Sequence, residues 1–466
     1  MDVDETPGSI AGIAGPGEGQ GERLVISESE HPIREAQLDL EALKVLYRLR
    51  DAGFKGYLVG GGVRDLYLGK QPKDFDISTD ARPGQLRKLF RNSRTIGRRF
   101  RLVQVFFRGN KIIEVSTLRS QSEFDLNGPE QVLPHNNTFG TLEEDAFRRD
   151  LTINSLFYEI ESNTIIDYTG GVNDLNQGIV RVVGDPDRRF TRDPVRMMRA
   201  VRHAARTGFL LDPQTLEAIK KHAEKLSLCP PSRLRDEILK DLQSGASLPW
   251  AELCLQTTLW ETLFPMYLPY LQDPSSREQV WGELQRLLQV LDRLQGARKE
   301  GKAVQIPEFM LLAVLLLPWA LRHFKLFETQ VRGQAYQQLA KKIRAELDLH
   351  IGEQFNIKRM AKDSLATLLI NLPTFHALGK EQNLPKWLRR KSYFRDCSRF
   401  YGLYRESLGS FEVKAESFQQ EQAGGPAPEL LPEKSVKSKG NGSGRRGGMN
   451  PAFSSSKEGV FGLRSS

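Results

Sequence analysis

Cysteine is scarce in this chain, and so are long apolar runs. The 466 residues include three cysteines, Cys229, Cys254 and Cys397, and no two of them lie close together. This spacing excludes a disulfide framework and a cysteine-rich zinc site, and it favours a reducing compartment, which we expect to be the cytoplasm. The longest apolar run, residues 309–320, contains Pro318 and is too short to cross a bilayer. The first residues do not resemble a secretory signal, so we expect no membrane association.

Two stretches of polar, glycine-rich sequence flank two parts of different texture. Residues 1–33 and 412–466 lack apolar periodicity, and we predict that both are disordered. Between residues 34 and 183, short β-branched or aromatic runs alternate with helical patterns. Residues 184–411 instead carry long stretches with apolar spacings of three and four, and no convincing strand. The sequence therefore predicts an α/β head followed by an all-helical body.

Three glycines separate a predicted strand from a predicted helix early in the head. Residues 57–59 form the apolar run, Gly60, Gly61 and Gly62 follow it, and Arg64 falls in the first turn of the helix. Glycines at such a junction let the backbone approach a ligand closely, and a helix start offers free N–H groups. With Arg64 this arrangement predicts a triphosphate site. The alternative is a simple tight turn, since the triplet matches neither Walker A nor GxGxxG.

Acidic residues follow the glycine turn. Asp74 and Asp76 are two apart in a strand-like run, so their side chains share one face. Two carboxylates that point together repel each other unless a cation or a proton lies between them, and hard oxygen ligands suit Mg²⁺. Glu114 lies on another apolar strand and could supply the third carboxylate of a two-metal site. The alternative for the aspartates is a solvated strand end.

A charged block further along the chain holds three more candidates. Residues 143–150 are mostly charged and lead into an apolar run. Arg149 could clamp a phosphate, with the carboxylate of Asp150 and the amide of Asn154 close by in the sequence. The alternative is a helix with ion pairs between residues four apart.

The last candidates lie on one predicted helix. We predict that Asp193 caps a helix whose first residue is Pro194. Arginines then recur at a spacing of three, at Arg196, Arg199 and Arg202. A carboxylate and a guanidinium one turn apart could recognise the edge of a base. The alternative is a solvated helix face.

These segments together resemble a known family. The stretches GGGVRDLYLGKQPKDFD, EEDAFRRDLTINSL and DPVRMMRAVR are similar to the three signature motifs of the class II nucleotidyltransferases. That family joins bacterial poly(A) polymerases with tRNA nucleotidyltransferases that add CCA. The resemblance implies an α+β fold, with a mixed five-stranded sheet in a nucleotidyltransferase head (residues 34–183), then a helical neck (184–270), and a helical body and tail (271–411).

The resemblance also implies roles for the candidate residues. Asp74 and Asp76 would be catalytic metal ligands, Asp150 a further catalytic carboxylate, and Glu114 remains an alternative metal ligand. The residues expected to bind the nucleotide are Gly61, Gly62, Arg64, Arg149, Asn154, Asp193, Arg196, Arg199 and Arg202. Residues 95–107 and 137–146 resemble segments that mark the poly(A) polymerases.

This choice within the family implies a specific reaction. It is the template-independent transfer of AMP from ATP to RNA 3′ ends, with Mg²⁺ or Mn²⁺ as cofactor, in RNA polyadenylation, processing and decay. Two departures are Arg192, where the family typically has Glu, and Leu151, which replaces a common Phe. The alternatives are a CCA-adding enzyme and a catalytically silent RNA-binding protein. The sequence indicates no protein partner and no oligomeric state.

Two basic stretches predict contacts with RNA. Lys and Arg exceed Asp and Glu over the whole chain, 67 against 58. Residues 87–101 contain seven cations and no anion, and residues 386–405 contain seven cations with Asp396 as the single anion. Aromatic residues such as Trp387, Phe394, Phe400 and Tyr401 are interleaved in the second stretch. Phosphate neutralisation combined with stacking holds single-stranded RNA with weak sequence preference. The alternative is that these aromatics, Trp387 and Phe394 above all, belong to the core. We expect RNA contacts from Arg98, Arg99, Arg389, Arg390 and Lys391.

Overall fold

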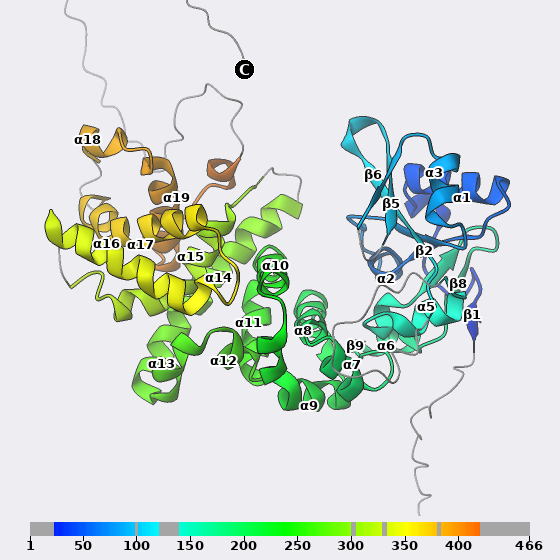
Figure 1. The fold of residues 1–466 in the computed structure, drawn as a ribbon, viewed down its shortest axis with the longest axis horizontal. Coiled ribbons are helices and arrows are strands. Elements are labelled where there is room, and N and C mark those ends of the chain that lie inside the picture. The colour runs from blue at the N-terminus through cyan, green and yellow to red at the C-terminus, as the bar shows by residue number, and fades with distance from the viewer. Residues whose placement is uncertain are drawn as a thin grey trace, which may run out of the picture. The chain divides into compact units, whose positions relative to one another are not determined.

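The head is built on one mixed β-sheet, and helices make up most of the rest of the chain (Figure 1). A computed structural model describes residues 23–97, 101–120, 139–299, 304–328, 333–379 and 384–419. The α+β class predicted from the sequence is confirmed. Within these ranges, no helix is long and apolar enough to cross a membrane.

The head sheet has eight strands in the described residues, in the order β1-β8-β7-β2-β3-β6-β5-β4. The expected five-stranded sheet is therefore too small, although its mixed character is confirmed. Strands β3 and β6 run parallel, and the other neighbours in the sheet are antiparallel. The strands are β1 (Leu24–Ile26), β2 (Gly56–Val59), β3 (Asp76–Thr79), β4 (Ser93–Ile96), β5 (Leu102–Phe106), β6 (Ile112–Thr117), β7 (Phe157–Glu159) and β8 (Thr164–Asp167).

Both predicted terminal disordered segments contain ordered residues. Strand β1 pairs with β8, so the expected disorder of residues 1–33 is wrong for its last part. At the other end, Val413 and Phe418 are buried, and Ala415–Phe418 form a 3₁₀ turn. The remainder of each segment, residues 1–22 and 420–466, lies outside the described residues.

The alternation of apolar and polar residues fixes how the central strands face. In β5 and β6 the buried residues are Val103, Val105, Ile113, Val115 and Thr117. The polar residues between them, among them Glu114, point to the opposite face because successive side chains of a strand alternate. Because of this alternation, the side chain of Glu114 points away from the core that these buried residues form.

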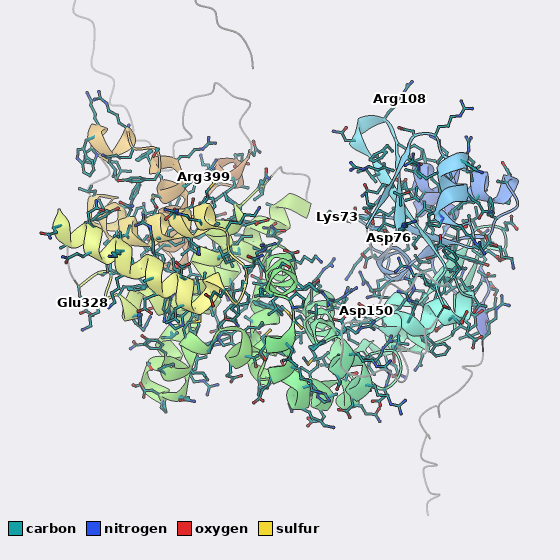
Figure 2. All side chains as sticks on the ribbon, in the orientation of Figure 1. Lys73, Asp76, Arg108, Asp150, Glu328 and Arg399 are labelled. Carbon is teal, nitrogen blue, oxygen red and sulfur yellow. The ribbon has the colours of Figure 1, made fainter. Side chains whose placement is uncertain are left out.

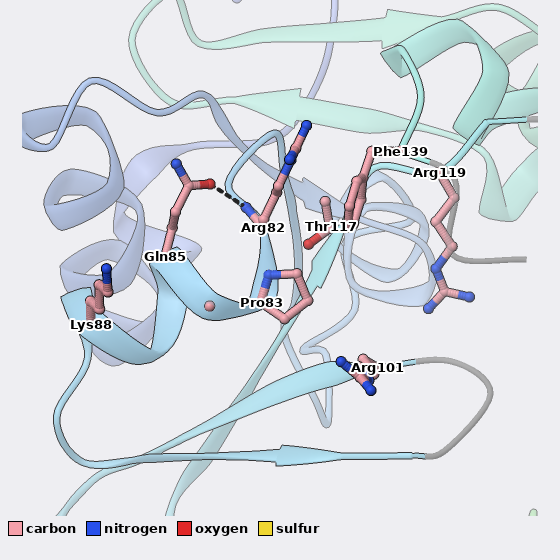
Figure 3. Close-up of a pocket in the computed structure, with 9 residues that line it drawn as sticks. Arg82, Pro83, Gln85, Lys88, Arg101, Thr117, Arg119 and Phe139 are labelled. Carbon is pink, nitrogen blue, oxygen red and sulfur yellow. Dashed lines mark hydrogen bonds between the residues drawn. The ribbon is translucent and has the colours of Figure 1, made fainter.

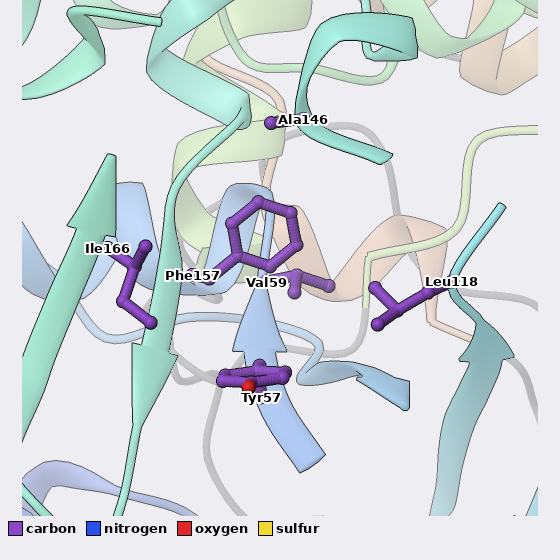
Figure 4. Packing of buried hydrophobic residues seen from close by; sticks show 6 residues of the cluster. All are labelled: Tyr57, Val59, Leu118, Ala146, Phe157 and Ile166. Carbon is purple, nitrogen blue, oxygen red and sulfur yellow. The ribbon is translucent and has the colours of Figure 1, made fainter. Parts of the chain in front are cut away.

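Another part of the head core lies between the sheet and α5 (Leu142–Arg148). Figure 4 shows the buried cluster of Tyr57, Val59, Leu118, Ala146, Phe157 and Ile166. The rings of Tyr57 and Phe157 meet edge to face, with centroids 6.2 Å apart. The remaining head helices are α1 (Leu40–Asp51), α2 (Gly61–Tyr67), α3 (Pro83–Leu89) and α6 (Gly171–Gln177).

Long amphipathic segments form the helical part, as their spacing predicts. One exception is β10 (Leu210–Leu211), in the part for which we predicted no strand, which pairs in parallel with β9 (Ile179–Val180). Trp260 is fully buried, and its ring lies 4.7 Å from that of Phe264 and 5.7 Å from that of Trp281. The helices are α7 (Pro186–Arg192), α8 (Val195–Thr207), α9 (Pro213–His222), α10 (Pro231–Leu242), α11 (Ser247–Gln256), α12 (Leu259–Leu263), α13 (Leu268–Gln272), α14 (Pro274–Lys299), α15 (Glu308–His323), α16 (Gln334–Leu347), α17 (Arg359–Gly379), α18 (Lys386–Arg389) and α19 (Phe394–Ser407).

We predict that Gly171→Ala destabilises the protein by about 1–3 kcal/mol, the usual range for overpacking. A Cβ at Gly171 would lie 2.2 Å from the carbonyl oxygen of Thr152, and backbone cannot move aside as a flexible side chain can. Gly282→Ala is the control, because its nearest neighbour is the flexible Arg286 side chain at 3.4 Å. In urea unfolding, the midpoint should fall for Gly171→Ala and hold or rise for Gly282→Ala. Equal midpoints would contradict the predicted clash.

Candidate active site

The glycine turn lies directly beside the predicted carboxylates. Strand β2 ends at Val59, which pairs with Asp76 of β3. Gly60 has a φ of 69°, a conformation that favours glycine, and α2 starts at Gly61. A Cβ at Gly62 would lie 3.4 Å from the backbone oxygen of Asp74. The turn and the acidic segment are thus packed together, as the sequence predicted.

Strand pairing brings Glu114 beside Asp76. The two residues are partners in the parallel register of β3 and β6. Gln104 of the neighbouring β5 donates a hydrogen bond from Nε2 to Glu114 Oε1 at 2.9 Å. Asp76, marked in Figure 2, is accessible to solvent, and Asp74 is exposed two residues before it. The expectation that an adjacent strand brings Glu114 near the aspartates is confirmed.

The electrostatics of Asp76 reflect this crowding of negative charge. The pKa of Asp76 is raised to about 6, mainly because the surrounding protein desolvates the carboxyl and also because the carboxylates of Glu114 and Asp74 lie near it, while Arg149 opposes this shift. The charged form is disfavoured here, so a cation would relieve the repulsion.

The donor set suits a hard divalent cation. Within the described residues, no group of three or more His, Cys, Asp or Glu side chains is assembled as a metal centre. Mg²⁺ is nevertheless commonly held by one or two carboxylates, with water and phosphate oxygens completing its shell. Asp74 and Asp76 fit that pattern, and the neighbouring carboxylates that contribute to the raised pKa of Asp76 would be neutralised by such a cation.

Arg149 is fixed on the same face of the sheet as Asp76. Its guanidinium contacts Asp145, with an Nη2–Oδ2 distance of 2.8 Å, and donates to Ser78 Oγ at 3.2 Å. It also lies over the ring of Phe157, 5.0 Å from the centroid. Ser78 is two residues beyond Asp76 on β3, so these contacts hold a positive charge next to the carboxylates.

Asp150, also marked in Figure 2, has a different partner. Its Oδ2 lies 2.6 Å from Nη2 of Arg199 on α8, and its Oδ1 accepts from the N–H of Leu151 at 2.9 Å. Burial alone would raise the pKa of Asp150, but the charges of Arg199 and Arg196 hold it well below its usual value. Asp150 therefore stays charged and ties the head to α8. Of the two candidates for a third carboxylate, strand pairing brings only Glu114 to Asp76.

Arg64, Asn154 and His203 form a cluster that the sequence showed only in part. Arg64 Nη1 donates to Asn154 Oδ1 at 2.6 Å, and Arg64 also pairs with Asp65. His203 Nδ1 lies 3.2 Å from Arg64 Nη1, and its Nε2 lies 3.3 Å from Asn154 Nδ2. The surrounding protein and the charge of Arg64 lower the pKa of His203 well below its usual value, so the ring is neutral.

A neutral imidazole accepts at only one nitrogen, yet both ring nitrogens of His203 face donors. The cluster therefore has an N–H donor without an acceptor inside it, which favours an oxygen-rich ligand such as a triphosphate or a ribose. The sequence motifs did not single out His203. The feature that could have revealed it is its position one helical turn after Arg199, on the same face of α8.

The other predicted residues of this helix have protein partners. Asp193 does not cap α8, because the helix starts at Val195 and Asp193 ends α7. Asp193 Oδ1 instead lies 3.0 Å from Arg233 Nη1. Arg196 donates to the backbone oxygen of Arg149 at 3.1 Å. Arg196 therefore packs against the charged segment, residues 143–150, whereas Asp193 packs against α10.

Arg202 is buried and ion-paired with Glu237 and Asp241 of α10. Its guanidinium is thus engaged inside the helical part, which does not support the nucleotide-binding role expected for it. A spacing of three along a helix rotates successive residues away from a common line, so Arg196, Arg199 and Arg202 meet different neighbours.

The second basic stretch is partly a surface and partly core. Arg389, Arg390 and Lys391 are exposed, and Trp387 is 54% exposed, so its assignment to the core is wrong. Phe400 and Tyr401 are buried and cannot stack with RNA bases. Phe394 is partly buried against Phe375, with ring centroids 5.8 Å apart. Arg98 and Arg99 lie outside the described residues.

Comparisons with known proteins agree with this architecture. Residues 56–181 match the poly A polymerase head domain, and residues 208–271 match the probable RNA and SrmB-binding site of polymerase A. Poly(A) polymerase I of Escherichia coli O6:H1 is 48% identical over 253 residues, which cover 53% of this chain and 54% of that protein. The CCA-adding enzyme of Bacillus subtilis is 37% identical over 257 residues, which cover 53% of this chain and 63% of that protein.

A solved structure shows the same fold. The crystal structure of the Bacillus stearothermophilus CCA-adding enzyme in complex with CTP superposes with a TM-score of 0.53 at 23% identity, covering 79% of this chain and 77% of that one. The matched head and RNA-binding segments are those of the class II nucleotidyltransferases, the family of poly(A) polymerases and CCA-adding enzymes. The matched segment spans about half the length of the poly(A) polymerase I relative.

The raised pKa of Asp76 predicts a pH-dependent gain in stability for Asp76→Asn. Because the folded carboxyl has a pKa of about 6, against 3.8 ordinarily, the folded state binds the proton more tightly than the unfolded chain. Folding stability should therefore fall as the pH rises from about 4 to about 6, and the loss should persist above that. In metal-free buffer, Asp76→Asn should raise Tm at pH 8, and the gain should vanish near pH 4.

Two controls accompany this measurement. Glu161→Gln, which removes an exposed carboxylate, should give no comparable gain. Adding Mg²⁺ should raise Tm of the wild-type protein at pH 8 and leave Asp76→Asn unchanged. A stability gain of the same size at pH 4 and pH 8 would rule out the carboxylate repulsion as its cause.

We predict that His203→Phe weakens ATP binding by about 10-fold or more. The ring volume is nearly kept, but the N–H donor without an acceptor inside the cluster is lost, and a hydrogen bond from it to a charged phosphate contributes about 1.5–3 kcal/mol. His203→Gln, which keeps an N–H donor, should restore most of the affinity. His222→Phe is the control, since His222 instead contacts Asp187. Calorimetric titration with ATP checks this, and wild-type affinity in His203→Phe would refute it.

Proposed function

We propose that this protein is a metal-dependent polynucleotide adenylyltransferase. It adds AMP from ATP to RNA 3′ ends without a template and releases pyrophosphate, in RNA polyadenylation, processing and decay. The observation that carries the proposal is the register of β3 and β6, which puts Glu114 beside Asp76 where β2 meets the glycine turn. Carboxylates, a close-approach turn and fixed arginines at one place suit a triphosphate bound through a divalent ion.

Mg²⁺, or Mn²⁺ in its place, bound by Asp74 and Asp76 would supply Lewis-acid activation of the attacking hydroxyl and charge neutralisation at the leaving pyrophosphate. Glu114 adds negative charge beside Asp76. Arg149, held by Asp145 and Ser78, directs its guanidinium to the phosphates. Arg64, held by Asp65 and Asn154, supplies further donors. Positioning and charge stabilisation carry the reaction, as in other phosphoryl-type transfers.

Poly(A) addition is our choice over CCA addition for two reasons. Residues 95–107 resemble a segment that marks the poly(A) polymerases. The E. coli poly(A) polymerase I relative is also 48% identical, against 37% for the B. subtilis CCA-adding enzyme. CCA addition is the second candidate, because solved structures that share this fold are CCA-adding enzymes.

Supplying each NTP alone separates the two activities. A poly(A) polymerase extends a generic RNA repeatedly with ATP and ignores CTP. A CCA-adding enzyme uses CTP and ATP on tRNA that lacks its end, and stops after CCA. Failure of every NTP with Mg²⁺ and with Mn²⁺ would leave the third possibility, an RNA-binding protein without catalysis.

We predict that Asp76→Ala lowers the rate of AMP incorporation at least about 10²–10³-fold, the range found when one preorganised electrostatic group is removed. The substitution removes one of the two carboxylates proposed to hold the metal and leaves the sheet intact. Incorporation of labelled ATP into RNA measures it, with thermal unfolding to verify the fold. Glu161→Ala, at an exposed carboxylate, is the control and should keep full activity. Full activity of Asp76→Ala would reject the assignment.

A further inference from the structure

A basic cavity lies on the head, away from the carboxylates. Its volume is about 560 Å³, and among the nine described residues that line it four are cations and none is acidic. The cations are Arg82, Lys88, Arg101 and Arg119, and Phe139 forms part of the wall. Figure 3 shows them around Pro83 at the start of α3. We call this feature the α3 cavity.

The four cations come from separate parts of the head. Arg82 precedes α3 and Lys88 lies within it, Arg101 directly precedes β5, and Arg119 follows β6. Only the fold brings them together. Like charges that converge repel each other, the described lining offers them no acidic residue, and an anion bound between them relieves the repulsion.

Arg119 is a partly buried member of this set. Partial burial lowers the pKa of Arg119, Asp145 opposes this shift, and Arg149, which lies outside the cavity lining, adds to it. A partly buried guanidinium near a second one is a setting in which a phosphate is favoured.

The cavity also offers an aromatic surface. Phe139 is 44% exposed, and the guanidinium carbon of Arg82 lies 5.1 Å from its ring centroid. An exposed ring beside cations is the arrangement on which unpaired bases stack in proteins that bind single-stranded nucleic acid. A free phosphate or a duplex would make no use of this ring.

The α3 cavity is distinct from the proposed catalytic site. Its Thr117 is the partner of Thr79, three residues along β6 from Glu114. At about 3.3 Å per residue, this is about 10 Å along the strand. An offset of three also turns Thr117 to the opposite face of the sheet from Glu114. A ligand in the cavity is therefore not the nucleotide that reacts at Asp76.

We propose that the α3 cavity binds single-stranded RNA at nucleotides away from the reacting 3′ end. Lys88, Arg101 and Arg119 contact the phosphates, and the Arg82–Phe139 pair stacks with a base. That this RNA is the substrate of the enzyme rests on the proposed function. That the cavity binds RNA does not.

Adjacent residues of α3 provide a matched pair of variants. Lys88 and Arg87 are both exposed, but only Lys88 lines the cavity. The probe is 5′-labelled oligo(A) of about 15 nucleotides, near the upper end of known single-strand site sizes. Its Kd is measured by fluorescence anisotropy at several salt concentrations. Lys88→Glu should raise the Kd about 10-fold, and Lys88→Ala should reduce the slope of log K against log salt by about 0.7, the value for one lost phosphate contact. Arg87→Glu should raise the Kd less than 3-fold, since it carries the same charge change outside the cavity.

The aromatic part of the proposal has its own test. Phe139→Ala should raise the Kd for oligo(A) by about 5- to 100-fold, the usual range for loss of one stacked base. Phe139→Tyr should keep wild-type affinity. Duplex RNA of the same length should bind Phe139→Ala as tightly as it binds wild type. Because Phe139 is exposed, neither substitution should lower Tm.

Three outcomes would overturn the inference. Equal effects of Lys88→Glu and Arg87→Glu would mean that only long-range charge acts. If Lys88→Glu or Phe139→Ala weakened the binding of ATP and left the binding of oligo(A) unchanged, the cavity would be a nucleotide subsite. Phe139→Ala without effect on oligo(A) would remove the stacked base.

These results are separable from those on catalysis. An inactive wild-type protein whose oligo(A) binding depends on Lys88 and Phe139 would keep the RNA site and reject the polymerase. An active wild-type protein whose RNA binding ignores both residues would do the reverse.

Discussion

The parallel pairing of β3 with β6 is the constraint on which the head depends. It aligns Asp76 with Glu114, and the antiparallel pairing of β3 with β2 aligns Asp76 with the last residue before the glycine turn. Since successive side chains alternate, this register sends the carboxylates to one face and Val115 and Ile77 into the core. A shift of the register by one residue would bury the carboxylates and expose the core. Core packing and the acidic site are therefore fixed by the same hydrogen bonds.

Helix α8 serves mainly to hold the charged segment of the head. Arg199 pairs with Asp150, and Arg196 binds the backbone oxygen of Arg149. His203 reaches Arg64 and Asn154. Residues from two of the segments that resemble family motifs thus contact one another. Such contacts limit the motion of Arg149 and Arg64, which is what a site that works by positioning requires.

Like charges converge twice in this head, with opposite sign. Asp74 and Glu114 contribute to the raised pKa of Asp76, and the cations of the α3 cavity meet without an acidic residue in its described lining. Like charges in each arrangement repel each other, and a ligand of opposite charge relieves the repulsion. A divalent ion with a triphosphate suits the first, and an RNA phosphate suits the second.

The sequence by itself determined whatever depends on local period and on backbone freedom. The strand, glycine turn and helix of residues 56–67 and the α+β class follow from local spacings and from the glycines. Tertiary structure alone decided which residues from distant segments meet. It added strands to the predicted five, gave Arg202 to Glu237 and Asp241, buried Phe400 and Tyr401, and placed His203 beside Arg64. Charge density marked residues 87–101, but only the fold separates Lys88, inside a cavity, from Arg87 beside it. A local pattern states which face a side chain takes, whereas the partner on that face comes from chain far away in the sequence.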